Sequence, residues 1–141
     1  MGTGDVTTRQ TLQLHWLRLE DVPAIFDVLD GIGLTSAQAC GDVWRNVVTC
    51  PLHGVAADEL FDSAPVATAL SAHFTGNRRF SNLPRKFKVA VSSCRHACAQ
   101  HEINDIGLVG VEHPDLGPGY DLWVGGGLGA SARIGRRLGA F

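Results

Sequence analysis

The sequence predicts an α+β fold, and the order of its strand-like and helix-like segments is the basis of the prediction. Residues 6–16 alternate between apolar and polar side chains with period two, and a helix-like segment at 20–30 follows them directly. Further strand-like segments appear at 86–92, 106–111 and 120–124. A strand, then a helix, then a strand-rich remainder is typical of an α+β arrangement.

The first strand-like segment has a polar face with an unusual composition. One parity contains Val6 and Trp16 with two leucines between them, which predicts a single strand with one buried face. The other parity lacks Lys and Glu, and its side chains can all donate hydrogen bonds. Such a face is either solvated or binds a ligand; its residues are Thr7, Arg9, Thr11, Gln13 and His15.

Three segments are predicted to be helical. Residues 20–30 begin with Asp21 as a candidate cap and Pro23 in the first turn. A second helix is expected after Asp62–Ser63, with Val66, Leu70 and Phe74 along one face. The glycine run Gly125–Gly127 is expected to lead into a third helix from about residue 130.

A pair of lysines is the feature that points most directly to chemistry. Lys86 and Lys88 lie two apart in a predicted strand, so their ammonium groups emerge on the same face, about 6–7 Å apart. An exposed strand face would tolerate this pair, and so would an anion-binding pocket. Arg9, Arg45 and Arg85 are cationic side chains that could join the same pocket, where they would suit a multiply anionic ligand.

The cysteines and glycines allow further interpretations. Cys94 and Cys98, with His96 and His101 nearby, could form a small Cys/His metal site, although the spacing is not a common zinc-finger spacing. The run Gly125–Gly127 lacks the GxGxxG spacing of dinucleotide-binding loops. It predicts a tight turn or a close approach of backbone to a ligand or a strand.

Composition and charge exclude several classes of protein. The formal net charge is −2 and no long run of one sign occurs, so a general nucleic-acid binder is not expected. The first residues, MGTGDVTTRQ, contain no apolar core of a secretory signal, and no apolar stretch is long enough to span a bilayer. We therefore expect a cytoplasmic protein without a membrane partner.

Six motifs in a fixed order resemble one known family. They are TTRQTLQLH, GDVWRNV, CPLHG, FTGNRRFSNLPRKFK, HEINDIGLVGVEHP and GYDLWVGGGLG, and together they span essentially the whole chain. The series is similar to the nitrite/sulfite reductases that contain sirohaem and a [4Fe–4S] cluster, especially the ferredoxin-dependent assimilatory members. The resemblance implies that residues 1–34 are the C-terminal part of a ferredoxin-like half-domain. Residues 39–141 would then be the first part of the sirohaem-binding α/β domain.

The resemblance also implies an activity and a set of site residues. The family reduces nitrite to ammonia or sulfite to sulfide in a six-electron reaction, with electrons from a donor such as ferredoxin. By motif match, Arg45, Lys86 and Lys88 would bind the oxyanion and supply protons. The sirohaem and its carboxylates would be contacted by four residues of the first predicted strand, Thr7, Arg9, Gln13 and His15. Asn104 would line the same region.

The family's cluster cysteines belong to the other half of the enzyme, which follows this region. Cys94 and Cys98 copy one of the family's cysteine spacings, but they are not assigned as cluster ligands. The chain alone is therefore expected to be incomplete and inactive without the C-terminal half. Two alternatives are a non-catalytic module that binds sirohaem or a partner, and a small Cys/His metal protein. The same cationic residues would suit nitrite and sulfite equally.

Overall fold

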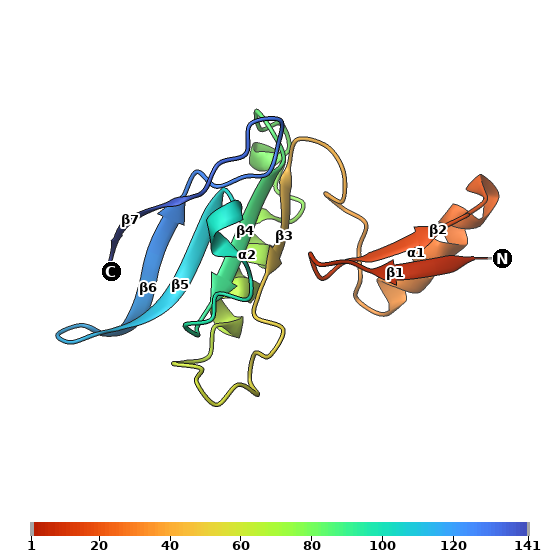
Figure 1. The fold of residues 1–141 in the computed structure, drawn as a ribbon. Helices are drawn as coiled ribbons and strands as arrows, with labels where there is room; N and C mark the ends of the chain where they lie inside the picture. Colours follow the sequence, from red (N-terminus) through yellow and green to blue (C-terminus); the bar gives the residue numbers. More distant parts are fainter. Residues whose placement is uncertain (1, 141) are drawn as a thin grey trace.

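The computed structural model describes residues 2–140 and contains two units of unequal size (Figure 1). A hairpin with one helix forms the first unit, and a five-stranded sheet with one helix forms the second. None of the helices in the described residues is both long and apolar enough to cross a membrane. The elements are β1 (Thr3–Val6), β2 (Leu12–His15), α1 (Val22–Gly31), β3 (Trp44–Val48), α2 (Ala64–Phe74), β4 (Phe87–Ser92), β5 (Ile106–His113), β6 (Gly117–Val124) and β7 (Arg136–Ala140).

The segment predicted to be one continuous strand is a hairpin, so that prediction was wrong. β1 and β2 pair antiparallel, with Val6 opposite Leu12. The turn between them is closed by two backbone hydrogen bonds, from the Thr7 N–H to the Thr11 carbonyl and from the Gln10 N–H to the Thr7 carbonyl, each 2.9 Å. Because paired residues have the same parity, the alternation continues across the turn and hides it.

The predicted buried face of this segment is exposed within the described chain. Val6 is 80% exposed and Trp16 is 82% exposed, and helix α1 has no buried residue. The helix itself is confirmed, with Pro23 in its first turn. Asp21 does not cap it through its side chain; its carboxylate instead accepts hydrogen bonds of 2.8 and 2.9 Å from Arg18.

The five-stranded sheet contains the hydrophobic core. Its order is β3-β4-β5-β6-β7; β3, β4 and β5 are parallel, and β6 and β7 add antiparallel (Figure 1). Val89 and Val91 of β4 are fully buried. As predicted, α2 follows Ser63 and directs one apolar face to the sheet, where the Phe74 ring stacks 3.6 Å from the Trp44 ring. The α+β fold is confirmed.

The helix expected from about residue 130 is absent from the described chain, and strand β7 occupies its place. Arg136 and Arg137 pair with Val124 and Trp123 of β6. Glycines at 129, 135 and 139 disfavour a helix. A strand at this position also satisfies backbone groups along the outer edge of β6, which is the physical reason for the difference.

Candidate functional site

A cationic pocket of about 420 Å³ lies where the hairpin turn meets the beginning of β3 and β4. It brings Arg45, Lys86 and Lys88, the predicted anion-binding residues, together with Thr7, Arg9 and Gln13. We call this hollow the cationic pocket; its complete lining is Thr7, Thr8, Arg9, Thr11, Gln13, Thr35, Ala37, Gln38, Ala39, Arg45, Asn46, Lys86 and Lys88.

The two lysines are held by the start of strand β4. They flank Phe87, whose ring stacks on Trp44 with the centroids 5.4 Å apart, so core packing fixes the backbone between them. The Lys88 N–H donates to the Asp105 carboxylate at 2.7 Å. Burial, followed by the neighbouring charges of Arg9 and Lys86, lowers the pKa of the Lys88 ammonium. Lys88 is therefore a stronger acid than an exposed lysine.

Arg9 reaches across from the hairpin turn and is fixed at both ends of its guanidinium. Its Nη1 donates to the Asn104 side-chain oxygen at 2.8 Å, and its Nη2 donates to the Asn46 carbonyl at 2.9 Å. Its Nε is buried and has no partner within the described residues. Burial and the nearby charge of Arg45 lower the pKa of Arg9.

Arg45 is oriented by the loop that precedes β3. Its guanidinium donates to the Ala39 carbonyl and, at 2.9 Å, to the Gly41 carbonyl. Its Nε, like that of Arg9, is buried without a partner in the described part of the chain. Two such N–H groups, together with two ammonium groups and the threonine hydroxyls, are donors that fit a ligand rich in carboxylates or a small oxyanion.

Two of the predicted cofactor residues lie outside the pocket lining. His15 faces Asp5 across the hairpin, with its Nε2 2.9 Å from the carboxylate. Asn104 is buried behind Arg9, and its amide nitrogen donates to the Gln100 carbonyl at 2.8 Å. The structure therefore does not bring His15 to the pocket, and it places Asn104 as a support for Arg9.

Several polar residues near the site were not predicted from the sequence. Asn46 and Gln38 line the pocket, and Asp105 holds the backbone of Lys88. Asn46 had one available signal, because it directly follows Arg45 in the motif WRNV. Gln38 had none, since its contacts to Phe74 and Gly76 depend on a distant segment.

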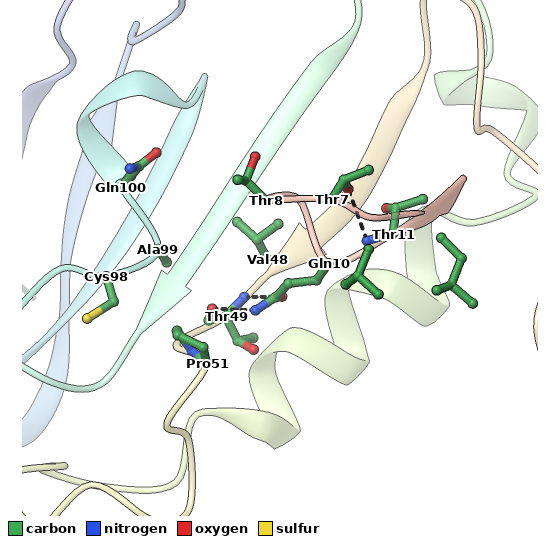
Figure 2. Close-up of a pocket in the computed structure, with 12 residues that line it drawn as sticks. Thr7, Thr8, Gln10, Thr11, Val48, Thr49, Pro51, Cys98, Ala99 and Gln100 are labelled. Carbon is green, nitrogen blue, oxygen red and sulfur yellow. Dashed lines mark hydrogen bonds between the residues drawn. The ribbon is translucent and has the colours of Figure 1, made fainter. Parts of the chain in front are cut away.

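A second hollow of about 590 Å³ opens on the other side of the hairpin turn (Figure 2). Thr7, Thr8 and Thr11 line both hollows, so the turn forms a wall between them. Figure 2 shows Gln10 pointing from the turn toward Thr49. The remaining wall is largely apolar and comes from Val6, Leu12, Val48, Thr49, Pro51, Cys98, Ala99 and Gln100.

The cysteines do not form a metal centre in the described residues. Cys50 and Cys94 are buried with their sulfurs 4.0 Å apart, whereas Cys40 and Cys98 are exposed. Within residues 2–140 no three or more His, Cys, Asp or Glu side chains are arranged to hold a metal. This donor set does not fit an iron–sulfur cluster, which takes four thiolates, or a structural zinc.

The histidines of the alternative Cys/His site are engaged elsewhere. His96 contacts the Asp58 carboxylate at 2.9 Å. The His101 ring is buried edge-on against Trp123, with the centroids 4.6 Å apart, and burial lowers its pKa. The interpretation of this chain as a small Cys/His metal protein is therefore contradicted by the placement of these residues.

The glycine run serves a close approach between two backbone segments. A Cβ atom on Gly126 would lie 2.2 Å from the Glu102 carbonyl oxygen and 2.6 Å from that of Asn104. The Gly135 N–H donates to the same Glu102 carbonyl at 2.7 Å. Because residue 126 is glycine, the segment that carries Asn104 can pack directly against the end of β6. Asn104 in turn accepts a hydrogen bond from Arg9, so this close approach also supports the position of Arg9.

Family models match most of the chain in two consecutive parts. Residues 1–32 match the nitrite/sulfite reductase ferredoxin-like half domain. Residues 40–141 match the nitrite and sulphite reductase 4Fe–4S domain.

Curated relatives and a solved structure agree with this assignment. The chain is 45% identical to sulfite reductase [ferredoxin] 1 of Mycolicibacterium paratuberculosis, over 96% of this chain and 24% of the relative. It is 43% identical to the assimilatory ferredoxin-dependent nitrite reductase of Haloferax mediterranei, over 99% of this chain and 25% of that relative. The structure of the Mycobacterium tuberculosis NirA protein superposes with a TM-score of 0.89 at 42% identity, covering 97% of this chain and 25% of that one. The chain thus spans about a quarter of the length of these relatives, and it belongs to the nitrite and sulfite reductase family.

Proposed function

We propose that this chain forms the anion-binding wall of the sirohaem pocket in a ferredoxin-dependent nitrite or sulfite reductase. The observation that carries the proposal is the convergence of Arg9, Arg45, Lys86 and Lys88 on one hollow. Like charges repel, so gathering four of them is unfavourable unless an anion occupies the space between them. The resemblance to ferredoxin-dependent sulfite and nitrite reductases supports a small oxyanion as the substrate.

The cations of the pocket have separate roles in this proposal. Arg9, with Thr7 and Gln13, binds carboxylates of the sirohaem, because guanidinium and carboxylate pair in a bidentate way. Arg45, Lys86 and Lys88 hold the substrate oxyanion and stabilise charge that develops on its oxygens. Asn104 acts by orienting Arg9. When bound, sirohaem supplies the redox-active iron.

Lys88 is the residue best suited to deliver protons. The reduction of nitrite to ammonia, or of sulfite to sulfide, releases each oxygen as water and therefore consumes protons. The lowered pKa of Lys88 makes its ammonium a better donor at neutral pH than an ordinary lysine would be. Lys86, which lines the same pocket, places a second ammonium group beside the anion.

The remaining parts of the reductase lie outside this chain in the proposal. Residues 1–34 belong to the ferredoxin-like half-domain and residues 39–141 to the sirohaem-binding domain. The four thiolates of the [4Fe–4S] cluster come from the C-terminal half, since the cysteines here do not fit one. Electrons come from ferredoxin, in line with the names of the relatives.

The test is an assay of the complete gene product. The protein is reconstituted anaerobically with sirohaem and an iron–sulfur cluster, and then given reduced methyl viologen with nitrite or sulfite. We expect reduction of at least one anion, and reduction of neither would refute the proposed activity. Lys86→Ala and Lys88→Ala should lower turnover with haem content unchanged, whereas Arg9→Ala should lower haem content.

A second candidate function is a module that binds sirohaem without catalysis. It is favoured by one observation, the lack of a cluster ligand set in residues 2–140. Titrating this chain alone with sirohaem separates the two candidates. A shifted Soret band without anion reduction supports the module, and an unshifted band excludes both roles for the isolated chain.

A further inference from the structure

We infer that Gln10 and Asn46 are positioning residues that lock the hairpin turn onto strand β3 and thereby hold Arg9 in the cationic pocket. The inference deepens the proposed function, because it rests on the cationic pocket as an anion site. Neither residue is charged, and neither was singled out by the sequence. Their hydrogen bonds join the hairpin turn to β3 at a point where Val6 and Leu12 of the hairpin are 80% and 56% exposed.

Gln10 behaves as a substitute for a neighbouring strand. Its side-chain oxygen accepts from the Thr49 N–H at 3.0 Å, and its side-chain nitrogen donates to the Thr49 carbonyl at 2.9 Å (Figure 2). Thr49 follows directly after β3, which is an edge strand of the sheet. An edge strand leaves N–H and carbonyl groups unpaired, and one primary amide can satisfy both groups of a residue.

Asn46 makes the reciprocal contact with Arg9. The side-chain nitrogen of Asn46 donates to the backbone carbonyl of Arg9 at 2.5 Å, and the backbone carbonyl of Asn46 accepts from the Arg9 guanidinium at 2.9 Å. The backbone and the side-chain end of Arg9 are therefore tied to the same residue of β3. Losing the side-chain amide of Asn46 would release the backbone of Arg9, so that its guanidinium would be held only by the Asn46 backbone carbonyl and Asn104.

Hydrogen bonds contribute more than apolar burial to the contact between the hairpin turn and β3. Val6 and Leu12, at the two ends of the turn, are 80% and 56% exposed, so burial contributes little to holding the hairpin in place. Gln10 also has a left-handed backbone, with φ of 57°, a conformation that a non-glycine residue adopts at a cost. The paired hydrogen bonds to Thr49 offset that cost and define the direction of the side chain.

The first part of the test measures the contact itself, without any ligand. Amide hydrogen exchange at Thr49 is compared in the 141-residue chain and in its Gln10→Ala variant. We expect exchange about tenfold faster in the variant, the equivalent of one lost hydrogen bond. Asn82→Ala is the matched control, since Asn82 is exposed and lies away from the pocket lining. Unchanged exchange at Thr49 in Gln10→Ala would overturn the inference, as would a Thr49 amide that is unprotected in the parent chain.

The second part separates positioning from mere stabilisation with a double-mutant cycle. Sirohaem affinity, followed through the Soret band, is measured for the parent chain and for Gln10→Ala, Asn46→Ala, Arg9→Ala and the two double variants. If Gln10 and Asn46 act through Arg9, which binds the sirohaem carboxylates in the proposed function, each single change weakens sirohaem binding about tenfold, but neither has a further effect once Arg9 is alanine. Gln10→Glu keeps the acceptor for the Thr49 N–H and loses the donor, so its affinity should be intermediate.

The two parts distinguish failure of the inference from failure of the proposed function. A parent chain that binds no sirohaem would count against the proposed pocket, and the exchange at Thr49 would still decide whether the lock exists. Additive losses in the cycle would show that Gln10 and Asn46 do not act through Arg9, even where sirohaem binds well. Either the additive result or the unchanged exchange is sufficient to reject the inference.

Discussion

The two units of the chain are stabilised in different ways. In the sheet, Val89 and Val91 are fully buried and an aromatic stack of Trp44 and Phe74 closes one face. In the hairpin–helix unit, Trp16 is 82% exposed and Val28 of α1 is 65% exposed. Burial therefore defines the shape of the sheet, and polar contacts of the hairpin turn define where the first unit sits. The cationic pocket lies at the junction and depends on both.

The largest expected effect comes from the tightest backbone contact of the sheet unit. Gly126→Ala would place a methyl group against the Glu102 and Asn104 carbonyls, where backbone atoms cannot easily move aside. We expect the free energy of unfolding to fall by about 3 kcal/mol, measured by urea denaturation. Gly129→Ala is the control, because a Cβ there meets no atom within 4 Å. Equal stability of the two variants would contradict this account of the glycine run.

A matched pair of valine substitutions compares the two units directly. Val91→Ala should lower the free energy of unfolding by about 2 kcal/mol, since it removes buried methyl groups from the core. Val28→Ala removes the same atoms from an exposed position on α1 and should change the free energy of unfolding by less than about 0.5 kcal/mol. Similar losses in both variants would mean that α1 is covered in solution, for example by another copy of the chain.

A smaller effect is expected from pH, and it reports on the sheet unit alone. Burial lowers the pKa of His101 in the folded chain, and both ring nitrogens lack a partner within the described residues. Below about pH 6.5, the ordinary pKa of histidine, the unfolded chain binds a proton that the folded chain resists. The stability that His101 contributes is therefore present above that pH and is lost as the pH falls through it.

Urea denaturation at several pH values checks this sign. The midpoint of the parent chain should decline on going from about pH 7.5 to about pH 5.5, and the decline should be shallower in His101→Phe, which keeps the packing against Trp123. An identical pH dependence in parent and variant would exclude His101 as its source.

Local patterns in the sequence were sufficient to predict much of the sheet and the cations of the site. The spacing of Lys86 and Lys88 places both at one pocket because strand geometry is local, and the apolar parity of Phe87, Val89 and Val91 predicts β4 directly. Charge alone made Arg9, Arg45 and Arg85 equal candidates for the same pocket, and the family resemblance selected Arg45 as the partner of the two lysines at the anion.

Long-range pairing explains what the sequence could not predict. The alternation of residues 6–16 continues across the turn at Gln10, so a hairpin and a single strand give the same pattern. Strand β7 forms by pairing with the free edge of β6. No local feature of the sequence around Arg136 and Arg137 predicts this pairing. The contacts of Gln10 and Asn46 join positions that lie almost forty residues apart, so no spacing rule would predict them.

Sulfite titration of the lysine variants tests the central claim most directly. Affinity is measured calorimetrically at low ionic strength for the parent chain, Lys86→Ala, Lys88→Ala and, as a control, Arg85→Ala, whose cation is adjacent in sequence but outside the pocket lining. We predict about tenfold weaker binding for each lysine variant, weaker binding for all at high salt, and little change for Arg85→Ala. Equal affinity in all four proteins would show that Lys86 and Lys88 do not form an anion site and would contradict the account.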